Sequence, residues 1–282
     1  MKILVTGARG QLGQEVVARA NARGLTVHGV GRDELDLSDW ASVSAGVQGF
    51  DVVINCAAHT RVDAAEGTER DAAFEANSVG TKNLAAACVE SGARLVHVST
   101  DYVFDGSKAS PYLESDPTNP QTVYGQSKLD GELSALAVHP DNCYVVRTAW
   151  VYGAYGPNFV KTMLNLAEAR DSVSVVTDQI GQPTWTGDLA EALIDLALST
   201  GVQPGVYHVS GEGECSWFEF AQEIFRNAGL DPARVKPTTS SEFVRPAPRP
   251  AYSVLSHQKW IDAGLRRPMQ WEDALREFFA RD

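Results

Sequence analysis

The sequence predicts an α/β fold, a doubly wound parallel sheet with a smaller C-terminal lobe. Short apolar runs rich in Val, Ile and Leu alternate with segments whose apolar residues recur at helical spacing. Runs that are apolar throughout suit strands that are covered on both faces. Strand and helix in alternation specify right-handed crossovers between parallel strands, and therefore a sheet with helices on both sides.

The elements of the sheet follow one another from the first residue. Strands are expected at 2–6, 26–30, 52–55, 94–99 and 143–148. Helices are expected between them, at 11–23, 38–47, 69–91 and 121–136. The longest of these helices ends beside Gly92, and glycine commonly caps a helix C-terminus.

The alternation becomes less regular after Trp150. Further helices are expected at 158–169, 188–198, 217–228 and 271–280, with strands at 173–177 and 205–209. Residues 231–250 hold five of the 13 prolines, which excludes a long helix there. We predict a division in which residues 1–150 and 186–212 form the sheet domain, while 151–185 and 213–282 form a substrate-binding lobe.

Composition excludes several classes of partner. The formal net charge of -12 argues against nucleic acid, because phosphate backbones are bound by basic surfaces. An anionic ligand would need a local group of cations, and the candidates lie in the C-terminal third: Arg245, Arg249, Arg266 and Arg267. No apolar run reaches the ~20 residues of a membrane helix, so we expect a cytoplasmic protein with no membrane contact.

The four cysteines suggest neither a zinc site nor a disulfide framework, because no two of them form a Cys-x-x-Cys pair. We expect all four to be buried small hydrophobes.

The glycine motif near the start predicts a dinucleotide site. Gly7, Gly10 and Gly13 follow a predicted strand and open a predicted helix. Glycines in that context make a tight turn, allow the backbone to approach a pyrophosphate and let helix and strand pack closely. The N-terminus of the helix then faces the phosphates. The sheet domain is therefore predicted to be an NAD(P)-binding Rossmann-type domain.

The end of the second strand bears on the choice of nicotinamide cofactor. An acid at this place binds the ribose 2'-hydroxyl of NAD, whereas an arginine accommodates the 2'-phosphate of NADP. The chain has Arg32 followed by Asp33, and Arg32 favours NADPH. A solvated Arg32, with Asp33 binding the ribose, remains the alternative and would permit NADH.

Tyr124 and Lys128 predict a redox enzyme. A spacing of four in a helix puts the phenol and the ammonium on one face, roughly 5 to 6 Å apart at their Cβ atoms. A nearby cation favours phenolate, so we expect Lys128 to lower the tyrosine pKa from about 10. The pair would then exchange a proton near neutral pH, downstream of the strand that ends in Thr100 and Asp101.

Several motifs together resemble a known family. They are Gly7-x-x-Gly10-x-x-Gly13, Ser99-Thr100-Asp101-Tyr102-Val103-Phe104, Tyr124-x-x-x-Lys128, Asp178-Gln179-x-Gly181-x-Pro183-Thr184 and Arg249-Pro250. Over essentially its whole length the chain resembles the extended short-chain dehydrogenase/reductases, and within them the family of dTDP-4-dehydrorhamnose reductases. The glycine and Tyr-x-x-x-Lys motifs identify only the superfamily, whereas the segments around Asp101 and Gln179 are much narrower signals.

The resemblance implies an activity and a set of site residues. NADPH, or NADH, would deliver hydride to C4 of a dTDP-4-keto-6-deoxy sugar, yielding dTDP-L-rhamnose from dTDP-4-dehydro-L-rhamnose. Tyr124 would protonate the alkoxide, Lys128 would bind the nicotinamide ribose, and Thr100 would polarise the ketone. The substrate would contact Thr100, Asp101, Trp150, Asn158 and Arg249, the last through the diphosphate. The cofactor would contact Gly7, Arg9, Gly10, Gln11, Leu12, Gly13, Arg32, Asp36, Leu37, Ala57, Ala58, Thr60, Val98, Tyr124 and Lys128.

Other interpretations stay open. Related dehydratases carry an Asp-Glu pair after the threonine, and here the pair is Asp101-Tyr102, which lacks the second acid. A 4-ketoreductase for another dTDP-deoxysugar would look much the same. A non-catalytic subunit resembling the regulatory subunit of methionine adenosyltransferase is the alternative outside enzymology. No metal ligand is assigned and magnesium binding is left open, as is the oligomeric state, a homodimer included.

Overall fold

A six-stranded parallel sheet forms the larger part of the computed structural model, which describes residues 1–281. Its strands are β1 (Lys2–Thr6), β2 (Thr26–Val30), β3 (Val52–Asn55), β4 (Arg94–Thr100), β5 (Cys143–Thr148) and β10 (Gly205–His208). They stand in the order β10-β5-β4-β3-β1-β2, and every neighbouring pair is parallel. The predicted doubly wound α/β fold is confirmed.

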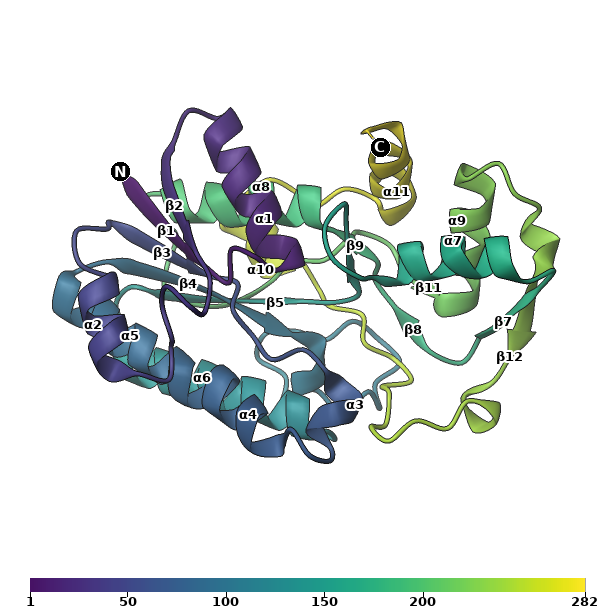
Figure 1. Cartoon of the computed structure of the whole chain (residues 1–282), viewed down its shortest axis with the longest axis horizontal. Coiled ribbons are helices and arrows are strands. Elements are labelled where there is room, and N and C mark those ends of the chain that lie inside the picture. Colours follow the sequence, from purple (N-terminus) through teal and green to yellow (C-terminus); the bar gives the residue numbers. More distant parts are fainter. Residues whose placement is uncertain (282) are drawn as a thin grey trace.

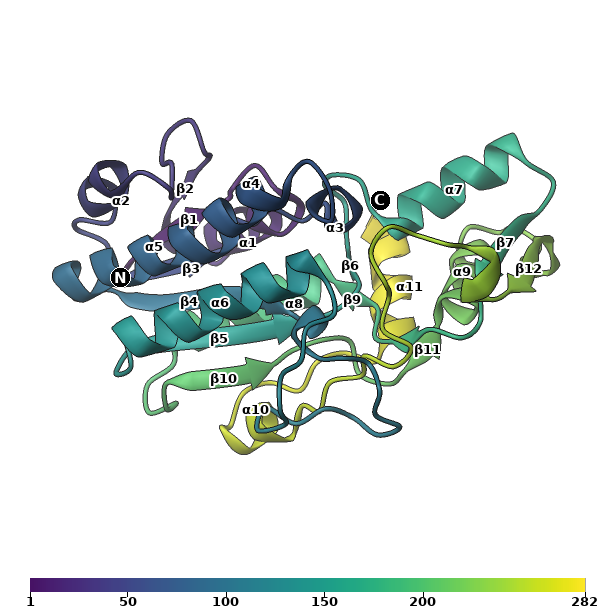
Figure 2. The same ribbon diagram turned by 90° about the horizontal axis from the view of Figure 1, so that it is seen from below.

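Helices cover both faces of this sheet (Figure 1). On one side lie α1 (Gln11–Ala22) and α8 (Thr186–Leu198), and on the other lie α2 (Trp40–Gly46), α5 (Gly80–Ser91) and α6 (Val123–Val138). Figure 2 shows the second layer from below, where α5 and α6 run side by side along the strands.

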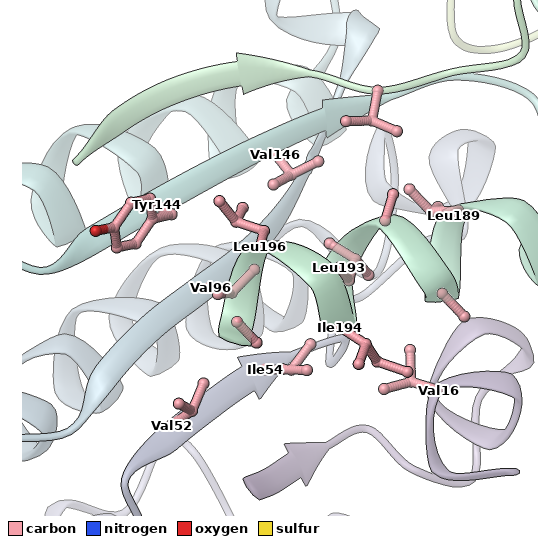
Figure 3. Packing of buried hydrophobic residues seen from close by; sticks show 14 of the residues in the cluster. Val16, Val52, Ile54, Val96, Tyr144, Val146, Leu189, Leu193, Ile194 and Leu196 are labelled. Atoms are coloured by element: carbon pink, nitrogen blue, oxygen red, sulfur yellow. The ribbon is translucent and has the colours of Figure 1, made fainter. Parts of the chain in front are cut away.

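Alternate residues of each strand enter different cores. Val52 and Ile54 of β3 pack with α1 and α8, whereas Val53 between them packs with α2 and α5. Figure 3 shows the first of these cores, in which Leu189 and Leu193 of α8 lie over the strands. Because both faces of the central strands are buried, these strands are largely apolar, as the sequence indicated, whereas Thr26 and His28 of the edge strand β2 are exposed.

The prediction of one regular helix at 69–91 is wrong. It consists of α4 (Arg70–Phe74), a five-residue π-helical turn (Glu75–Val79) and α5. The buried Asn77 in that turn donates to His59 O and to Ser127 Oγ of α6. Its carbonyl lies so close to α6 that a Cβ on Gly131 would stand 2.1 Å from the oxygen. The widened turn, a feature common at functional sites, therefore joins the loop after β3 to α6.

A second core lies beside the carboxyl edge of the sheet, at the right of Figure 1. It is built by α7 (Phe159–Ala169), β7 (Val173–Val176), α9 (Trp217–Asn227), β12 (Val235–Thr238) and α11 (Trp271–Arg281). Three short pairs of strands complete it: β7 with β12, β6 (Val151–Tyr152) with β9 (Thr184–Trp185), and β8 (Ile180–Gly181) with β11 (Cys215–Ser216). We retain the predicted division at residues 150, 186 and 212 as a proposal.

Short elements connect these parts. They are α3 (Val62–Ala65), α10 (Gln258–Asp262) and four 3₁₀ or π turns, at Glu75–Val79, Asp101–Val103, Pro232–Arg234 and Ser240–Glu242. Among the residues that the structure describes, no helix has both the length and the hydropathy of a bilayer span.

The cysteines are free thiols. Cys88, Cys143 and Cys215 are buried as expected, but Cys56 is only partly buried. It directly follows β3 at the carboxyl edge of the sheet.

A buried ion pair holds α6 on the sheet. Arg147 of β5 donates from Nη2 to Glu132 Oε2 over 2.7 Å and from Nε to Oε1 over 3.0 Å. The two side chains are 4% and 1% exposed. The guanidinium also lies 5.0 Å over the Phe104 ring.

We predict that Arg147→Met lowers the free energy of unfolding by about 3 to 5 kcal/mol, because the carboxylate of Glu132 is left buried without its partner. Urea unfolding measures this loss. The double variant Glu132→Leu/Arg147→Met removes both charges and should lose much less. A double variant that is less stable than Arg147→Met would contradict this account.

Candidate active site

The glycine turn between β1 and α1 leaves room for a ligand at the carboxyl edge of the sheet, where open α/β sheets bind dinucleotides. Gly7 has φ +66, and a Cβ there would lie 2.6 Å from the backbone of Ala57. A Cβ on Gly13 would lie 2.3 Å from the carbonyl oxygen of Gly7. Both glycines are therefore required by close backbone contacts. The turn ends at Gly10, the residue before α1, so free N–H groups of the helix face the space that a pyrophosphate would fill.

The guanidinium groups of Arg9, from the glycine turn, and Arg32 both lie near the acids that follow β2. Arg9 Nη2 lies 2.8 Å from Asp33 Oδ2 and 3.3 Å from Glu34 Oε2. Arg32 is 72% exposed, and its nearest acid is Asp36, with Nε 3.5 Å from Oδ2. Asp33, the alternative ribose ligand, is thus already paired with Arg9. This pairing joins residues 24 positions apart, so sequence reasoning had no signal for it.

Other predicted cofactor residues lie around the same edge. Asp36 accepts hydrogen bonds from the backbone and hydroxyl of Ser38, and the neighbouring Leu37 is buried. Ala57, Ala58 and Thr60 follow β3 in the loop that meets the glycine turn.

Gln11 and Asn158 connect the glycine turn to the second core. Gln11 Nε2 donates to Val151 O, and Asn158 Nδ2 donates to Gln11 Oε1 and to Gly153 O. Asn158 Oδ1 caps α7 by accepting from Lys161 N. The side chain of Asn158 is therefore held by protein groups and does not line the cavity described below, and its contact with substrate stays a prediction.

Tyr124 and Lys128 are both carried by α6, whose first turn packs against the segment after β4. Thr122 caps the helix by accepting from Gly125 N, and a Cβ on Gly125 would lie 2.2 Å from Tyr102 O. Tyr124 meets Tyr102 edge to face, with ring centroids 5.5 Å apart. The close approach brings the phenol of Tyr124 to Thr100, at the end of β4.

Burial dominates the proton affinities of this pair. It raises the pKa of Tyr124 to about 12; the hydrogen bond with Thr100 lowers the pKa and the charge of Asp101 raises it. Burial lowers the pKa of Lys128 to about 8. The prediction that Lys128 lowers the pKa of Tyr124 is wrong, because the Lys128 Nζ points away, to Val98 O at 2.7 Å. Tyr124 therefore remains a protonated phenol across the neutral range.

Asp101 is a second buried titratable group in the site. Its Oδ1 accepts from Thr100 Oγ1 over 2.9 Å, while Oδ2 has no hydrogen-bond partner among the described residues. Burial raises the pKa of Asp101 to about 6; hydrogen bonds with Ser253 and Thr100 act in the opposite direction. The carboxyl group thus titrates close to neutral pH beside Tyr124.

A cavity of about 560 Å³ lies between the second core and the loop that follows β12, and Tyr102, which meets Tyr124 edge to face, is part of its wall. It is lined by Tyr102, Trp150, Phe159, Thr162, Met163, Leu166, Arg170, Ser172, Val173, Ser174, Val175, Val176, Gln179, Trp217, Phe243, Arg245, Arg249 and Pro250. Its walls combine aromatic and aliphatic side chains with polar ones, and three arginines are among them, Arg170, Arg245 and Arg249. A volume of this size accommodates a small-molecule ligand.

Two tryptophans form one wall of the cavity. Trp150 and Trp217 stack with ring centroids 3.6 Å apart and planes 10° from parallel. Trp150 has φ 46, and a Cβ on Gly181 would lie 2.4 Å from the indole, so this glycine makes room for the stack. Sequence reasoning missed Trp217, because its spacing with Phe220 is that of an ordinary core helix.

Asp63 of α3 holds Arg245 and Arg249 at the cavity. Arg249 Nη2 lies 2.9 Å from Asp63 Oδ2, and Arg245 Nη1 lies 3.7 Å from the same oxygen. Of the four candidate arginines, Arg266 and Arg267 lie elsewhere, paired with Asp188 and Glu212. The described residues include no group of three side chains suited to a metal ion.

Comparison with known proteins gives consistent matches over nearly the whole chain. The model of the RmlD substrate binding domain matches residues 1–282. A dTDP-4-dehydrorhamnose reductase of Streptomyces griseus is 50% identical, over 98% of this chain and 92% of that protein. A probable dTDP-4,6-dihydroxy-2-methyloxan-3-one 4-ketoreductase of Streptomyces antibioticus is 44% identical, over 99% and 95%. The crystal structure of dTDP-4-dehydrorhamnose reductase from Bacillus anthracis str. Ames in complex with NADP has a TM-score of 0.95 and 40% identity, with 100% of both chains covered.

We predict that Asp101→Asn stabilises the protein in a pH-dependent way. Because the folded-state pKa is about 6, above the ordinary 3.8, the stability due to Asp101 is present below about pH 4 and lost as pH rises through 6. The variant should gain on the order of 2 to 3 kcal/mol at pH 8, at about 1.4 kcal/mol per pKa unit, and almost nothing at pH 4.

Urea unfolding between pH 4 and pH 8 measures this difference. Asp141→Asn, at an exposed position, is the matched control and should show no such trend. A gain for Asp101→Asn that does not change with pH would contradict the role of burial.

Proposed function

This chain belongs to the family of the RmlD substrate binding domain, and we propose that it is a dTDP-4-keto sugar reductase that uses NADPH. One observation supports this most strongly. Thr100, Asp101 and Tyr124 meet at the carboxyl edge of the sheet, between the glycine turn and an aromatic cavity that contains Arg245 and Arg249. The same edge thus offers a place for a dinucleotide, a proton donor and a place for a second anionic ligand.

The cofactor proposal rests on the glycine turn and on the end of β2. The Bacillus anthracis relative was crystallised with NADP. The glycines of the turn here pack closely against the backbone, which leaves space for a pyrophosphate. Arg32, exposed and only loosely paired with Asp36, is the proposed ligand of the 2'-phosphate. NADH remains the alternative, although Asp33 is engaged by Arg9. When bound, the nicotinamide supplies a hydride.

Reduction of a ketone also needs a proton, and Tyr124 is the proposed donor. With a pKa of about 12 the phenol carries its proton throughout the neutral range. It releases that proton only to a stronger base, such as the alkoxide that forms as the carbonyl carbon is reduced. The hydroxyl of Thr100 adjoins Tyr124 and is the second proposed donor toward the same oxygen, a role for which its single proton must turn away from Asp101 Oδ1.

The proposed substrate is a sugar linked to dTDP. Guanidinium groups match the geometry of phosphate oxygens, and Arg245 and Arg249 bring two of them to the cavity in a protein of net charge -12. The stacked Trp150 and Trp217 offer apolar faces for rings. Asp101 and Trp150 are the proposed contacts of the sugar.

We propose dTDP-4-dehydro-L-rhamnose as the sugar, with dTDP-L-rhamnose as the product, on the similarity to the Streptomyces griseus reductase at 50% identity. Reduction of another dTDP-4-keto-6-deoxy sugar is the second candidate, favoured by the Streptomyces antibioticus ketoreductase at 44%. A non-catalytic binding subunit would not need the arrangement of Thr100 and Tyr124.

We predict that Tyr124→Phe lowers the rate constant of reduction by about two to four orders of magnitude, the usual contribution of a general acid. The ring is kept, so NADPH binding and the free energy of unfolding should stay close to those of the wild type. Nicotinamide absorbance measures the rate with a panel of dTDP-, UDP- and GDP-linked 4-keto-6-deoxy sugars, and NMR identifies the product. If NADPH and sugar nucleotides bind yet no member of the panel oxidises the cofactor, the reductase proposal fails.

We predict that Arg249→Ala weakens the binding of dTDP by about ten-fold or more, since a hydrogen bond to a charged group contributes roughly 1.5 to 3 kcal/mol. NADPH binding should be nearly unchanged. Isothermal titration calorimetry measures both ligands. Arg267→Ala is the matched control, because Arg267 pairs with Glu212 away from the cavity. Equal dTDP affinities for Arg249→Ala and the control would remove Arg249 from the site.

A further inference from the structure

Residues 241–246 form a strap along the cavity that is held at both ends. All six residues are exposed, and Phe243 and Arg245 among them also line the cavity. Figure 1 shows this segment in yellow-green, running from the end of β12 back toward α3. The proposed function uses Arg245 but does not explain what keeps the strap in place.

The first anchor of the strap is Ser240. Its N donates to Asp178 Oδ2 over 2.9 Å and to Oδ1 over 3.0 Å, and its Oγ donates to Oδ1 over 2.9 Å. Gln179 Nε2 donates to Ser240 Oγ over 2.8 Å. Asp178 and Gln179 begin the motif that ends at Thr184, and the proposed function has given these two residues no part.

The two-stranded sheet behind this anchor fixes its position. β7 and β12 pair in parallel up to Val176 and Thr238. Thr177 extends the pairing, since its N and its Oγ1 both donate to Thr238 O, over 3.0 and 3.2 Å. Asp178 and Ser240 therefore follow neighbouring strand ends, and their hydrogen bonds attach the start of the strap to the second core.

The second anchor is Ala247, directly after the strap. Ala247 is fully buried, and its N donates to Asp63 Oδ1 of α3 over 3.2 Å. Pro246 and Pro248 on either side have a fixed φ, which limits the freedom of the chain there. Because the strap is short, the backbone position of Arg245 depends on both anchors.

The contacts of the Arg245 side chain are loose. Its Nη1 lies 3.7 Å from Asp63 Oδ2, and its guanidinium lies 6.0 Å from the centre of the Phe243 ring, which belongs to the strap itself. The side chain is 56% exposed. Exposed contacts of this kind contribute little, because holding a long side chain in one geometry costs entropy. The backbone of the strap therefore decides whether Arg245 faces the cavity.

We propose that Asp178, acting through Ser240, is a positioning residue for the anionic ligand, because it holds the strap so that Arg245 faces the cavity. This inference rests on the proposed function, in which the anionic ligand is the diphosphate of a dTDP-linked sugar. Asp178 is not among the residues that line the cavity, so it acts without touching the ligand.

Electrostatics alone predicts the opposite effect of removing Asp178. A carboxylate near an anion site repels the anion, so loss of this charge by itself would strengthen the binding of dTDP. Loss of the anchor would weaken binding, because the strap must then be ordered when the ligand binds. The sign of the change in affinity thus distinguishes a positioning role from a charge effect.

Isothermal titration calorimetry of Asp178→Ala measures this sign. We expect dTDP to bind about five-fold or more weakly, the equivalent of one ordinary hydrogen bond, while NADPH binding stays unchanged. Asp171→Ala is the matched control for charge, because Asp171 is an exposed acid two residues before β7. If Asp178→Ala binds dTDP as the control does, or loses affinity for NADPH to the same extent, the proposal is overturned.

The route through Arg245 is tested by a double-mutant cycle. If Asp178 acts by placing Arg245, then Asp178→Ala should weaken dTDP binding less in an Arg245→Ala background than in the wild type. Effects that add in full would overturn the proposed route.

The anchor can also be tested without any ligand. Phe243 is 48% exposed, so chymotrypsin can cut after it once the strap loosens, and mass spectrometry identifies fragments 1–243 and 244–282. We expect cleavage of Asp178→Ala to be about five-fold faster than that of the wild type. Asp178→Asn keeps one acceptor for Ser240 and should be cut at an intermediate rate.

This measurement separates failure of the inference from failure of the proposed function. Equal cleavage of the wild type and Asp178→Ala would overturn the anchor itself. A wild-type protein that does not bind dTDP would contradict the proposed substrate, and faster cleavage of Asp178→Ala would still support the anchor.

Discussion

The packing of α6 against β4 and β5 is the constraint on which the site depends. The helix presents polar side chains to the sheet, and each has a partner there: Glu132 pairs with Arg147, and Lys128 donates to Val98 O. Burying such groups is costly unless they are hydrogen-bonded or paired. The same contacts that offset this cost fix the rotation and depth of α6, and with them the position of Tyr124 beside Thr100.

Burial then determines the protonation states in the site. It raises the pKa of Tyr124 to about 12 and that of Asp101 to about 6, and it lowers that of Lys128 to about 8. In each case the low dielectric favours the uncharged form. A proton donor, an acid close to neutrality and a weakly basic amine therefore arise from one cause, the exclusion of water at the carboxyl edge.

The positive charge that Arg245 and Arg249 bring to the cavity is local and is neutralised in part by one carboxylate. The two arginines belong to a protein of net charge -12, and both meet the carboxylate of Asp63. An anionic ligand in the cavity would compete with that carboxylate for the two guanidinium groups, so its affinity depends on Asp63 as well as on the arginines. Asp63 also ties the loop after β12 to α3, because Ala247 N donates to Asp63 Oδ1 over 3.2 Å.

The fold could be predicted from sequence because its strands are buried on both faces and its turns need glycine, and both requirements appear as local patterns.

The spacing of Tyr124 and Lys128 likewise places both on one helix. Spacing does not show, however, how deeply the two side chains are buried. That depends on their contacts with residues of the sheet that lie far away in the sequence. Lys128 meets His97, 31 positions earlier, and His97 meets Asn55 on a third strand. The prediction that Lys128 lowers the pKa of Tyr124 therefore failed, although the prediction of the helix was right. The same reason explains why Trp217 was missed, since its stack with Trp150 joins residues far apart in the sequence. The hydrogen bond between Asn158 and Gln11, 147 positions apart, could not be foreseen either.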